Sequence, residues 1–347
     1  MSVDGGIEEK RISRRSFLKA ATLLTAGGVM SAVELNIASK GRLFNLIGKT
    51  IEEAPDIIKA RQESKIDHFC EQVMGTESIE TVENNDLFIV LRPKIWFGNK
   101  TTRWVHDPVL TFFKPRARAV LENVPNGKRE ILIETIQSPV FLGPIGNVTG
   151  DYDRNLIDPG VNLNTLFPSR VSSGQRFGPQ RLVDRFPGFG DDVNKASGGI
   201  VIRNGVLNIV NRDGLVTEVA TGSDPFFQSV YYFDESNTPR VLRESWQVHE
   251  QKFVIGNTHF FYAAYFQIKL GREPVSGFIV NDKSTMALSN FIRTVASMSD
   301  GGSYKIALVD GGNGSSAFIR CTDNQVKVFG RNGSDDHLIP FTVKVGI

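Results

Sequence analysis

The chain has 347 residues, of which 40% are apolar and 22% charged, an ordinary composition for a globular protein with an ample core. Its 40 Lys and Arg against 38 Asp and Glu give a net charge of only +2, which excludes the basic footprint of a nucleic-acid platform. The 24 Phe and 33 Gly, beside 6 Tyr and 3 Trp, predict a turn-rich, Phe-packed and strand-heavy architecture.

The N-terminus carries a targeting pattern. Residues 13–19 read S-R-R-S-F-L-K and precede the weakly apolar stretch Ala20–Val33. The pattern resembles a twin-arginine export signal, whereas the alternative is a basic amphipathic first helix. The stretch has 14 residues, fewer than the roughly 20 that cross a bilayer, so we expect no stable transmembrane anchor. We predict that residues 1–38 are a twin-arginine-type signal peptide, that the export machinery is a partner, and that the protein is periplasmic or extracellular.

Cysteines and histidines give no sign of a metal site. Cys70 and Cys321 lie far apart without metal-ligand spacing, and we expect two unrelated, mostly buried thiols. The five histidines are scattered without the H-x-x-x-H or H-E-x-x-H spacing of a zinc site.

The part before residue 146 divides into two predicted segments. Residues 39–83 are predicted to form a helical segment, because apolar residues between Arg42 and Met74 recur near a 3.6-residue period. Pro55 interrupts this pattern, so we expect two helices or one kinked helix. Residues 84–145 form a strand-rich N-terminal part of unknown role, either an added domain or an extension of the same sheet. Its expected strands are Leu87–Leu91, Lys94–Phe97, Val109–Phe113, Ala117–Leu121 and Arg129–Ile136.

Residues 143–198 are rich in Gly, Pro, Asn, Asp and Arg and show little periodicity. A loop region of this length is functional or disordered, and interspersed phenylalanines such as Phe167 and Phe177 favour an ordered surface. Its cluster Asp151-Tyr-Asp153-Arg could serve a sugar, a cation or a phosphate, or be a set of solvated turn residues.

Strands resume at Gly198–Val210, where Asn204-Gly205 between two apolar runs predicts a β-hairpin. An amphipathic helix is expected from the N-cap Ser284 to Met298. The other expected strands of this half are Ser229–Phe233, Val241–Val248, Phe253–Ile255, Phe260–Leu270, Val275–Val280, Gln325–Phe329 and Leu338–Val345. Together the pattern predicts an α+β fold, a strand-rich mixed sheet with a few packed helices.

The stretch Lys305–Arg320, K-I-A-L-V-D-G-G-N-G-S-S-A-F-I-R, contains the strongest candidate site. A buried-strand pattern delivers Asp310 to its end, and the residues that follow are small enough for backbone N–H groups to approach a ligand. The alternative is a tight strand–loop–strand connection with a turn at Asn313-Gly314.

The C-terminal half resembles the phosphodiester glycosidase family. Three segments carry the resemblance. G-G-I-V-I-R-N-G matches the family's glycine-bearing hairpin, and the helix beginning S-T-M-A-L-S matches its G-M-T-L-x-E helix. The strand A-L-V-D-G-G-N-G-S-S matches a family strand that ends A-L-N-L-D-G-G-G-S-S-T. The resemblance covers roughly Asn147 to the C-terminus, which defines a phosphodiester-glycosidase-like domain at 146–347. The loop has one residue more than the family's, and Tyr262-Ala-Ala-Tyr265 stands where the family has R-T-A-I-G.

The resemblance implies an exported hydrolase that cleaves the bond between a sugar anomeric carbon and a phosphodiester in a glycan or envelope polymer. The alternative is a non-catalytic exported glycan-binding or structural protein on the same fold. The partner is then a carbohydrate or glycosyl phosphate, with no nucleic acid involved. No cofactor is implied with certainty; a divalent cation such as calcium is one option, with ligands unknown.

The resemblance also implies roles for residues of the candidate site. Asp310 would act as base or nucleophile, hold a cation, or cap its own loop. A second carboxylate is needed for two-acid chemistry; Asp282 is assigned with Asp310 as catalytic, although Asp151 and Asp153 compete for this role. The expected substrate-binding residues are Gly311, Gly312, Asn313, Gly314, Ser315, Ser316, Asn147, Asp151, Asp153, Arg203 and Asn204.

Overall fold

The computed structural model describes residues 79–98, 103–124, 140–145, 167–183, 197–248, 251–270, 273–311, 316–330 and 341–346. All of them belong to one compact unit, residues 62–347. Four predicted features lie outside the described residues: the signal peptide, the helical pattern before residue 75, the strand Arg129–Ile136 and the cluster at 151–154.

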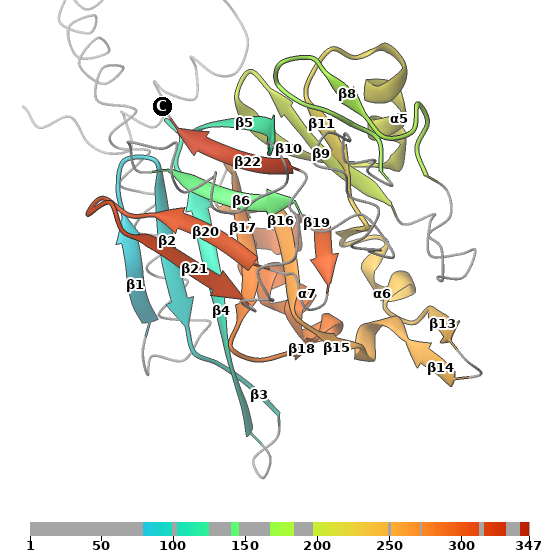
Figure 1. Cartoon of the computed structure of the whole chain (residues 1–347). Helices are drawn as coiled ribbons and strands as arrows, with labels where there is room; N and C mark the ends of the chain where they lie inside the picture. Colours follow the sequence, from blue (N-terminus) through green and yellow to red (C-terminus); the bar gives the residue numbers. More distant parts are fainter. Residues whose placement is uncertain are drawn as a thin grey trace, which may run out of the picture. The chain divides into compact units, whose positions relative to one another are not determined.

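An eight-stranded sheet forms the centre of this unit (Figure 1). Its strands, in spatial order, are β1 (Ile79–Asn84), β2 (Phe88–Pro93), β4 (Arg103–Phe113), β17 (Glu273–Asp282), β16 (Tyr262–Leu270), β19 (Tyr304–Gly311) and β12 (Tyr231–Asp234), with β3 (Ile95–Gly98) paired to β4. Both faces are apolar because alternate residues of one strand enter different cores: Phe88 and Val90 join one core, and Ile89 and Leu91 join the other.

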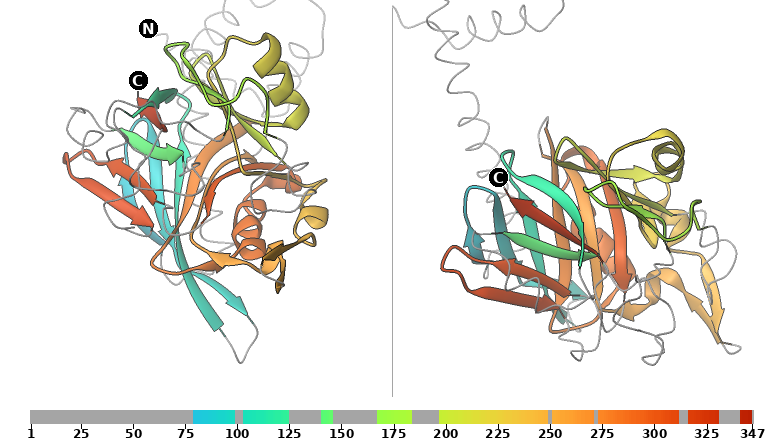
Figure 2. Two further views of the ribbon diagram at one scale, coloured as in Figure 1. Left: turned by 45° about the vertical axis from the view of Figure 1, so that its right-hand side comes forward. Right: turned by 45° about the horizontal axis from the view of Figure 1, so that its top comes forward.

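Two five-stranded sheets supply the other side of the first core. One has the order β21 (Val326–Gly330), β20 (Ser316–Arg320), β6 (Phe141–Ile145), β22 (Phe341–Gly346) and β5 (Arg118–Asn123). The other has the order β10 (Val206–Asn211), β9 (Gly198–Arg203), β11 (Phe226–Gln228), β7 (Ser169–Arg170) and β8 (Arg176–Phe177). Side chains from both, such as Phe341 and Ile200, pack with Tyr265 and Phe278 of the large sheet, so the layers form a sandwich (Figure 2).

The second core covers the opposite face of the large sheet. There α7 (Leu288–Ala296) buries Phe291, Ile292 and Val295 against residues such as Phe266 of β16. The remaining described elements are α5 (Arg212–Thr221), α6 (Thr238–Val241), η4 (Ile255–Asn257), η5 (Asp300–Gly302), the hairpin β13 (Ser245–Val248) with β14 (Gln251–Val254), and the pair β15 (His259–Phe260) with β18 (Met286–Ala287). No helix in the described ranges is long and apolar enough to cross a membrane.

The predicted fold class is wrong. The described part of the chain is a strand-dominated β sandwich, in which all strand pairings are antiparallel and α-helix is confined to α5, α6 and α7. The physical reason is that strands rather than helices cover the large sheet on its first face. A mixed sheet with packed helices does not describe this arrangement.

Strands on either side of residue 146 hydrogen-bond to one another. β4 pairs with β17 from Asp107 opposite Asp282 to Phe112 opposite Gly277, and β5 pairs with β22 along its whole length. Residues 79–123 therefore supply strands to the same sheets as the C-terminal half.

Some of the local predictions are confirmed and others are wrong. The hairpin at Asn204-Gly205 is confirmed: β9 and β10 pair up to Arg203 opposite Val206, and the turn residues have φ of 52° and 76°. The N-cap at Ser284 is wrong, because Met286 and Ala287 first pair with β15 and α7 begins at Leu288. The helix α5 was not predicted.

Candidate functional site

The candidate site lies at one edge of the large sheet, where β17 and β19 both end. These two strands run in the same direction because β16 pairs antiparallel with each of them. Asp282 is the last residue of β17, and Asp310 and Gly311 are the last two of β19. Tyr262, the first residue of β16, pairs with Gly311 and belongs to the same edge.

A β-bulge interrupts β19 just before Asp310. Ala264 pairs with Leu308 whereas Ala263 pairs with Asp310, which leaves Val309 as the extra residue. Bulges occur next to active sites because they change which residue of a strand meets a given face. Here residue 310 pairs with Ala263, and Val309 beside it is buried in the same core between the sheets as Ala263.

The two ends of the D-G-G-N-G-S-S stretch belong to different sheets. Gly311 ends β19 in the large sheet, and Ser316 begins β20 in a five-stranded sheet, where it pairs with Gly330 of β21. Residues 312–315 between them lie outside the described residues. The stretch therefore connects two sheets, because β19 and β20 do not pair with each other. The predicted turn at Asn313-Gly314 lies outside the described residues and stays a prediction.

Asp282 is buried and fully engaged. Its Oδ2 receives a hydrogen bond from Arg92 Nη2 at 2.7 Å, and its Oδ1 accepts one from the backbone N–H of Gly330 at 3.1 Å. Only 7% of its side chain is exposed. Asp107, half-buried on β4, stands directly opposite Asp282 in the ladder.

Arg92 completes this group and was not predicted. It lies on β2, its guanidinium sits 5.1 Å from the ring centroid of Phe329, and its Nη1 also contacts Glu80 at 3.2 Å. It is 190 residues from Asp282 in sequence. The only local signal is its place at the end of a buried apolar strand, which says nothing about its partner.

Asp310 and Asp282 occupy the same edge but are not adjacent. Ala263 of β16 pairs with both Asp310 and Val280, and Asp282 follows two residues later. Two strand spacings across and two residues along give a backbone separation of roughly 12 Å. The carboxyl groups of two-acid glycosidases are about 5 to 9.5 Å apart, so the ladder does not by itself place Asp282 beside Asp310.

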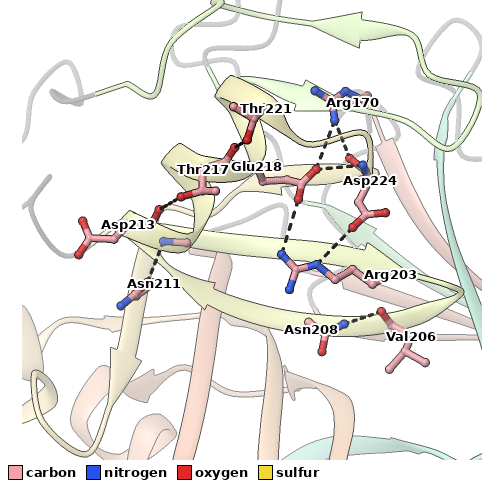
Figure 3. Close-up of polar contacts among 11 residues, drawn as sticks. Arg170, Arg203, Val206, Asn208, Asn211, Asp213, Thr217, Glu218, Thr221 and Asp224 are labelled. Atoms are coloured by element: carbon pink, nitrogen blue, oxygen red, sulfur yellow. Dashed lines mark hydrogen bonds and ion pairs between the residues drawn. The ribbon is translucent and has the colours of Figure 1, made fainter.

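Arg203 and Asn204 lie elsewhere. Arg203 Nε contacts Asp224 Oδ2 at 3.2 Å, and its Nη2 lies 3.6 Å from Glu218 Oε2 (Figure 3). Glu218 also pairs with Arg170, whose burial lowers the pKa of its guanidinium. The turn after Asn204 contacts β5, because Ala119 N donates to Gly205 O at 2.7 Å, and β5 is at the far side of its sheet from β20 and β21.

The other expected site residues are only partly placed. Gly311 and Ser316 have backbone positions at the two strand ends. The remaining expected residues lie outside the described ranges: Gly312, Asn313, Gly314, Ser315, Asn147, Asp151 and Asp153. Within the described ranges no three His, Cys, Asp or Glu residues gather as a metal site. Cys321 is a buried thiol, as expected, and burial raises its pKa to about 11.

Comparison with protein-family models gave no match, and comparison with curated proteins gave none. Among solved structures, the chain is similar to the zebrafish N-acetylglucosamine-1-phosphodiester alpha-N-acetylglucosaminidase catalytic domain, auto-inhibited by its pro-peptide. That similarity has a TM-score of 0.42 and 12% identity over 78% of this chain and 87% of that one. A hypothetical protein from Synechocystis is similar with a TM-score of 0.34 and 9% identity, over 78% of this chain and 64% of that one. Both likenesses are distant.

Proposed function

We propose that the chain is a hydrolase that cleaves the bond between a sugar anomeric carbon and a phosphodiester. The observation that carries the proposal is the position of D-G-G-N-G-S-S, the stretch with the most specific resemblance to phosphodiester glycosidases. It leaves the end of β19 in the large sheet and leads into β20 of the facing sheet. A glycine-rich crossing at the end of a rigid strand can present backbone N–H groups to an anion.

The chemistry follows from the leaving group. Water attacks the anomeric carbon, its proton passes to the Asp310 carboxylate, and the C–O bond breaks with its electron pair on the phosphate oxygen. Phosphate is a good leaving group, so this reaction needs a strong general acid less than ordinary glycoside hydrolysis does. N–H groups of residues 311–316 and the hydroxyls of Ser315 and Ser316 would stabilise the departing anion.

The direct test incubates the purified protein, without residues 1–38, with a GlcNAc-1-phosphodiester and quantifies free sugar. We expect steady release of sugar together with the phosphomonoester in equal amounts. Absence of release across several glycosyl phosphodiesters, from protein with a cooperative unfolding transition, would refute the proposal.

A non-catalytic glycan-binding protein is the second candidate, and one observation favours it. Where the family has R-T-A-I-G, this chain has Tyr262, Ala263, Ala264 and Tyr265, all at most 3% exposed. That segment offers no cation to a phosphate. This candidate predicts glycan binding that survives Asp310→Asn, without turnover by the wild-type protein.

We also propose export through the twin-arginine route, supported by S-R-R-S-F-L-K and the short apolar stretch after it. The substrate would then be an envelope or extracellular polymer. Replacing both Arg14 and Arg15 by Lys should retain the protein in the cytoplasm of a bacterial host, measured by fractionation. Unchanged export of this double variant would contradict the proposal.

A further inference from the structure

We infer that Arg92 and Asp282 are positioning residues, which hold the start of β20 against the edge where β19 ends. This inference deepens the proposed function and gives Asp282 a role other than the acid–base role expected for it. Both carboxylate oxygens of Asp282 accept a hydrogen bond, Oδ2 from Arg92 Nη2 and Oδ1 from the Gly330 N–H.

The contact joins two sheets. Asp282 and Arg92 belong to β17 and β2 of the large sheet, whereas Gly330 belongs to β21 of a five-stranded sheet. Phe329 adds a second link, because the Arg92 guanidinium lies 5.1 Å from the centroid of its ring. Four residues from three strands thus form one clamp across the sandwich, which we call the Arg92–Asp282 clamp.

The clamp acts on the candidate site through a single ladder step. Gly330, held by Asp282, pairs with Ser316, the first residue of β20 and the last of the D-G-G-N-G-S-S stretch. The other end of that stretch, Asp310 and Gly311, is fixed in the large sheet by pairing with β16. The Arg92–Asp282 clamp therefore sets where one end of the stretch lies relative to the other.

Charge balance explains why an arginine is used. Asp107 stands opposite Asp282 on the neighbouring strand, and like charges directly opposite each other destabilise a ladder. A guanidinium can neutralise a buried carboxylate, stack on an aromatic ring and still donate to Glu80, which a lysine ammonium does less well.

The test separates positioning from chemistry by two substitutions of one residue. Asp282→Asn keeps an oxygen for the Gly330 N–H but loses the charge, whereas Asp282→Ala loses both. A positioning role predicts that Asn is the milder change, with kcat within about fivefold of wild type, and that Ala lowers kcat about 10- to 100-fold with little change in KM. An acid–base or nucleophilic role predicts that both variants fail equally, which would overturn the inference.

A second readout does not depend on the proposed reaction. Amide hydrogen exchange at Gly330 and Ser316 should be faster in Arg92→Met and Asp282→Ala than in the wild type. In Arg92→Lys, which keeps the positive charge, exchange at these residues should be slower than in Arg92→Met. Val295→Ala, which weakens the core on the other face of the sheet, is the control: its Tm should fall while exchange at Gly330 and kcat stay unchanged. Unchanged exchange at Gly330 and Ser316 in Asp282→Ala would overturn the inference, whether or not the wild-type protein cleaves glycosyl phosphodiesters.

Discussion

The carboxylate of Asp234 organises the turn between β12 and α6. It accepts hydrogen bonds from Ser236 N at 2.9 Å, Ser236 Oγ at 2.7 Å and Asn237 N at 2.9 Å. Burial alone would raise its pKa, but these hydrogen bonds to the ionised form outweigh burial and hold the pKa of Asp234 below its ordinary value.

The stability that Asp234 contributes therefore depends on pH in a defined direction. Because the folded pKa is lower than the unfolded value of about 3.9, ionised Asp234 adds stability that is fully present above that value and is lost as pH falls through the folded pKa. We predict that Asp234→Ala lowers the free energy of unfolding by about 1 kcal/mol near pH 7. Urea unfolding should show this difference shrinking near pH 3; a difference that is the same at both pH values would contradict the assignment.

At the scale of single elements, α5 depends on its N-cap Asn211, the residue just before the helix. Asn211 Oδ1 accepts a hydrogen bond from Gly214 N at 3.0 Å (Figure 3). The helix then buries Leu215 and Val219. We predict that Asn211→Ala costs about 1 kcal/mol of unfolding free energy, because an N-cap acceptor is lost. Asn208→Ala, in the neighbouring strand, is the matched control with an expected change within about 0.5 kcal/mol. Equal effects in urea unfolding would contradict a capping role.

The elements that the sequence predicted well are those with strong local signals. The Asn204-Gly205 hairpin and strands such as β2 follow from turn residues and apolar alternation, which act over a few residues. By contrast, α5 contains a glycine and several β-branched residues, so its propensity is low and its packing against β9 and β11 decides its conformation. The start of α7 was misplaced for a similar reason, since pairing of β18 with β15 takes Met286 and Ala287.

At the scale of the whole sandwich, Gly143 shows how closely the sheets approach. The Tyr265 hydroxyl of β16 donates to Gly143 O of β6 at 2.8 Å, which joins the large sheet to a five-stranded sheet. A Cβ at this position would lie 2.3 Å from that hydroxyl oxygen and 2.7 Å from the Phe141 ring. We therefore predict that Gly143→Ala destabilises the protein by about 1–3 kcal/mol through overpacking.

The control for this prediction is Tyr265→Phe. It removes the hydrogen bond but leaves Gly143 O with the Thr342 hydroxyl at 3.3 Å, so a loss of about 1 kcal/mol is expected. Combining Gly143→Ala with Tyr265→Phe should be less damaging than the sum of the two, because the added methyl group then meets no hydroxyl. Strictly additive losses in thermal unfolding would contradict a clash with Tyr265.

The tertiary arrangement was beyond the sequence because it depends on contacts between distant segments. Asp310 could be placed at the end of a buried strand by local pattern alone. Strand pairing brings Asp282 to the same edge, and an ion pair links it to Arg92, 190 residues away in the sequence. Neither contact produces a local sequence pattern that could predict it. The fold class was wrong for the same reason, since nothing local shows that strands rather than helices cover the first face of the large sheet.

Asp310 is the residue on which the proposed reaction depends most directly. The decisive measurement is the ratio of kcat for wild type and Asp310→Asn on a GlcNAc-1-phosphodiester, with binding of the intact substrate measured in parallel by calorimetry. We predict that Asp310→Asn lowers kcat at least about 1,000-fold, a loss typical of removing a central catalytic group, while substrate binding and Tm stay near wild type. Equal turnover by the two proteins would contradict a catalytic role for Asp310 and with it the proposed site.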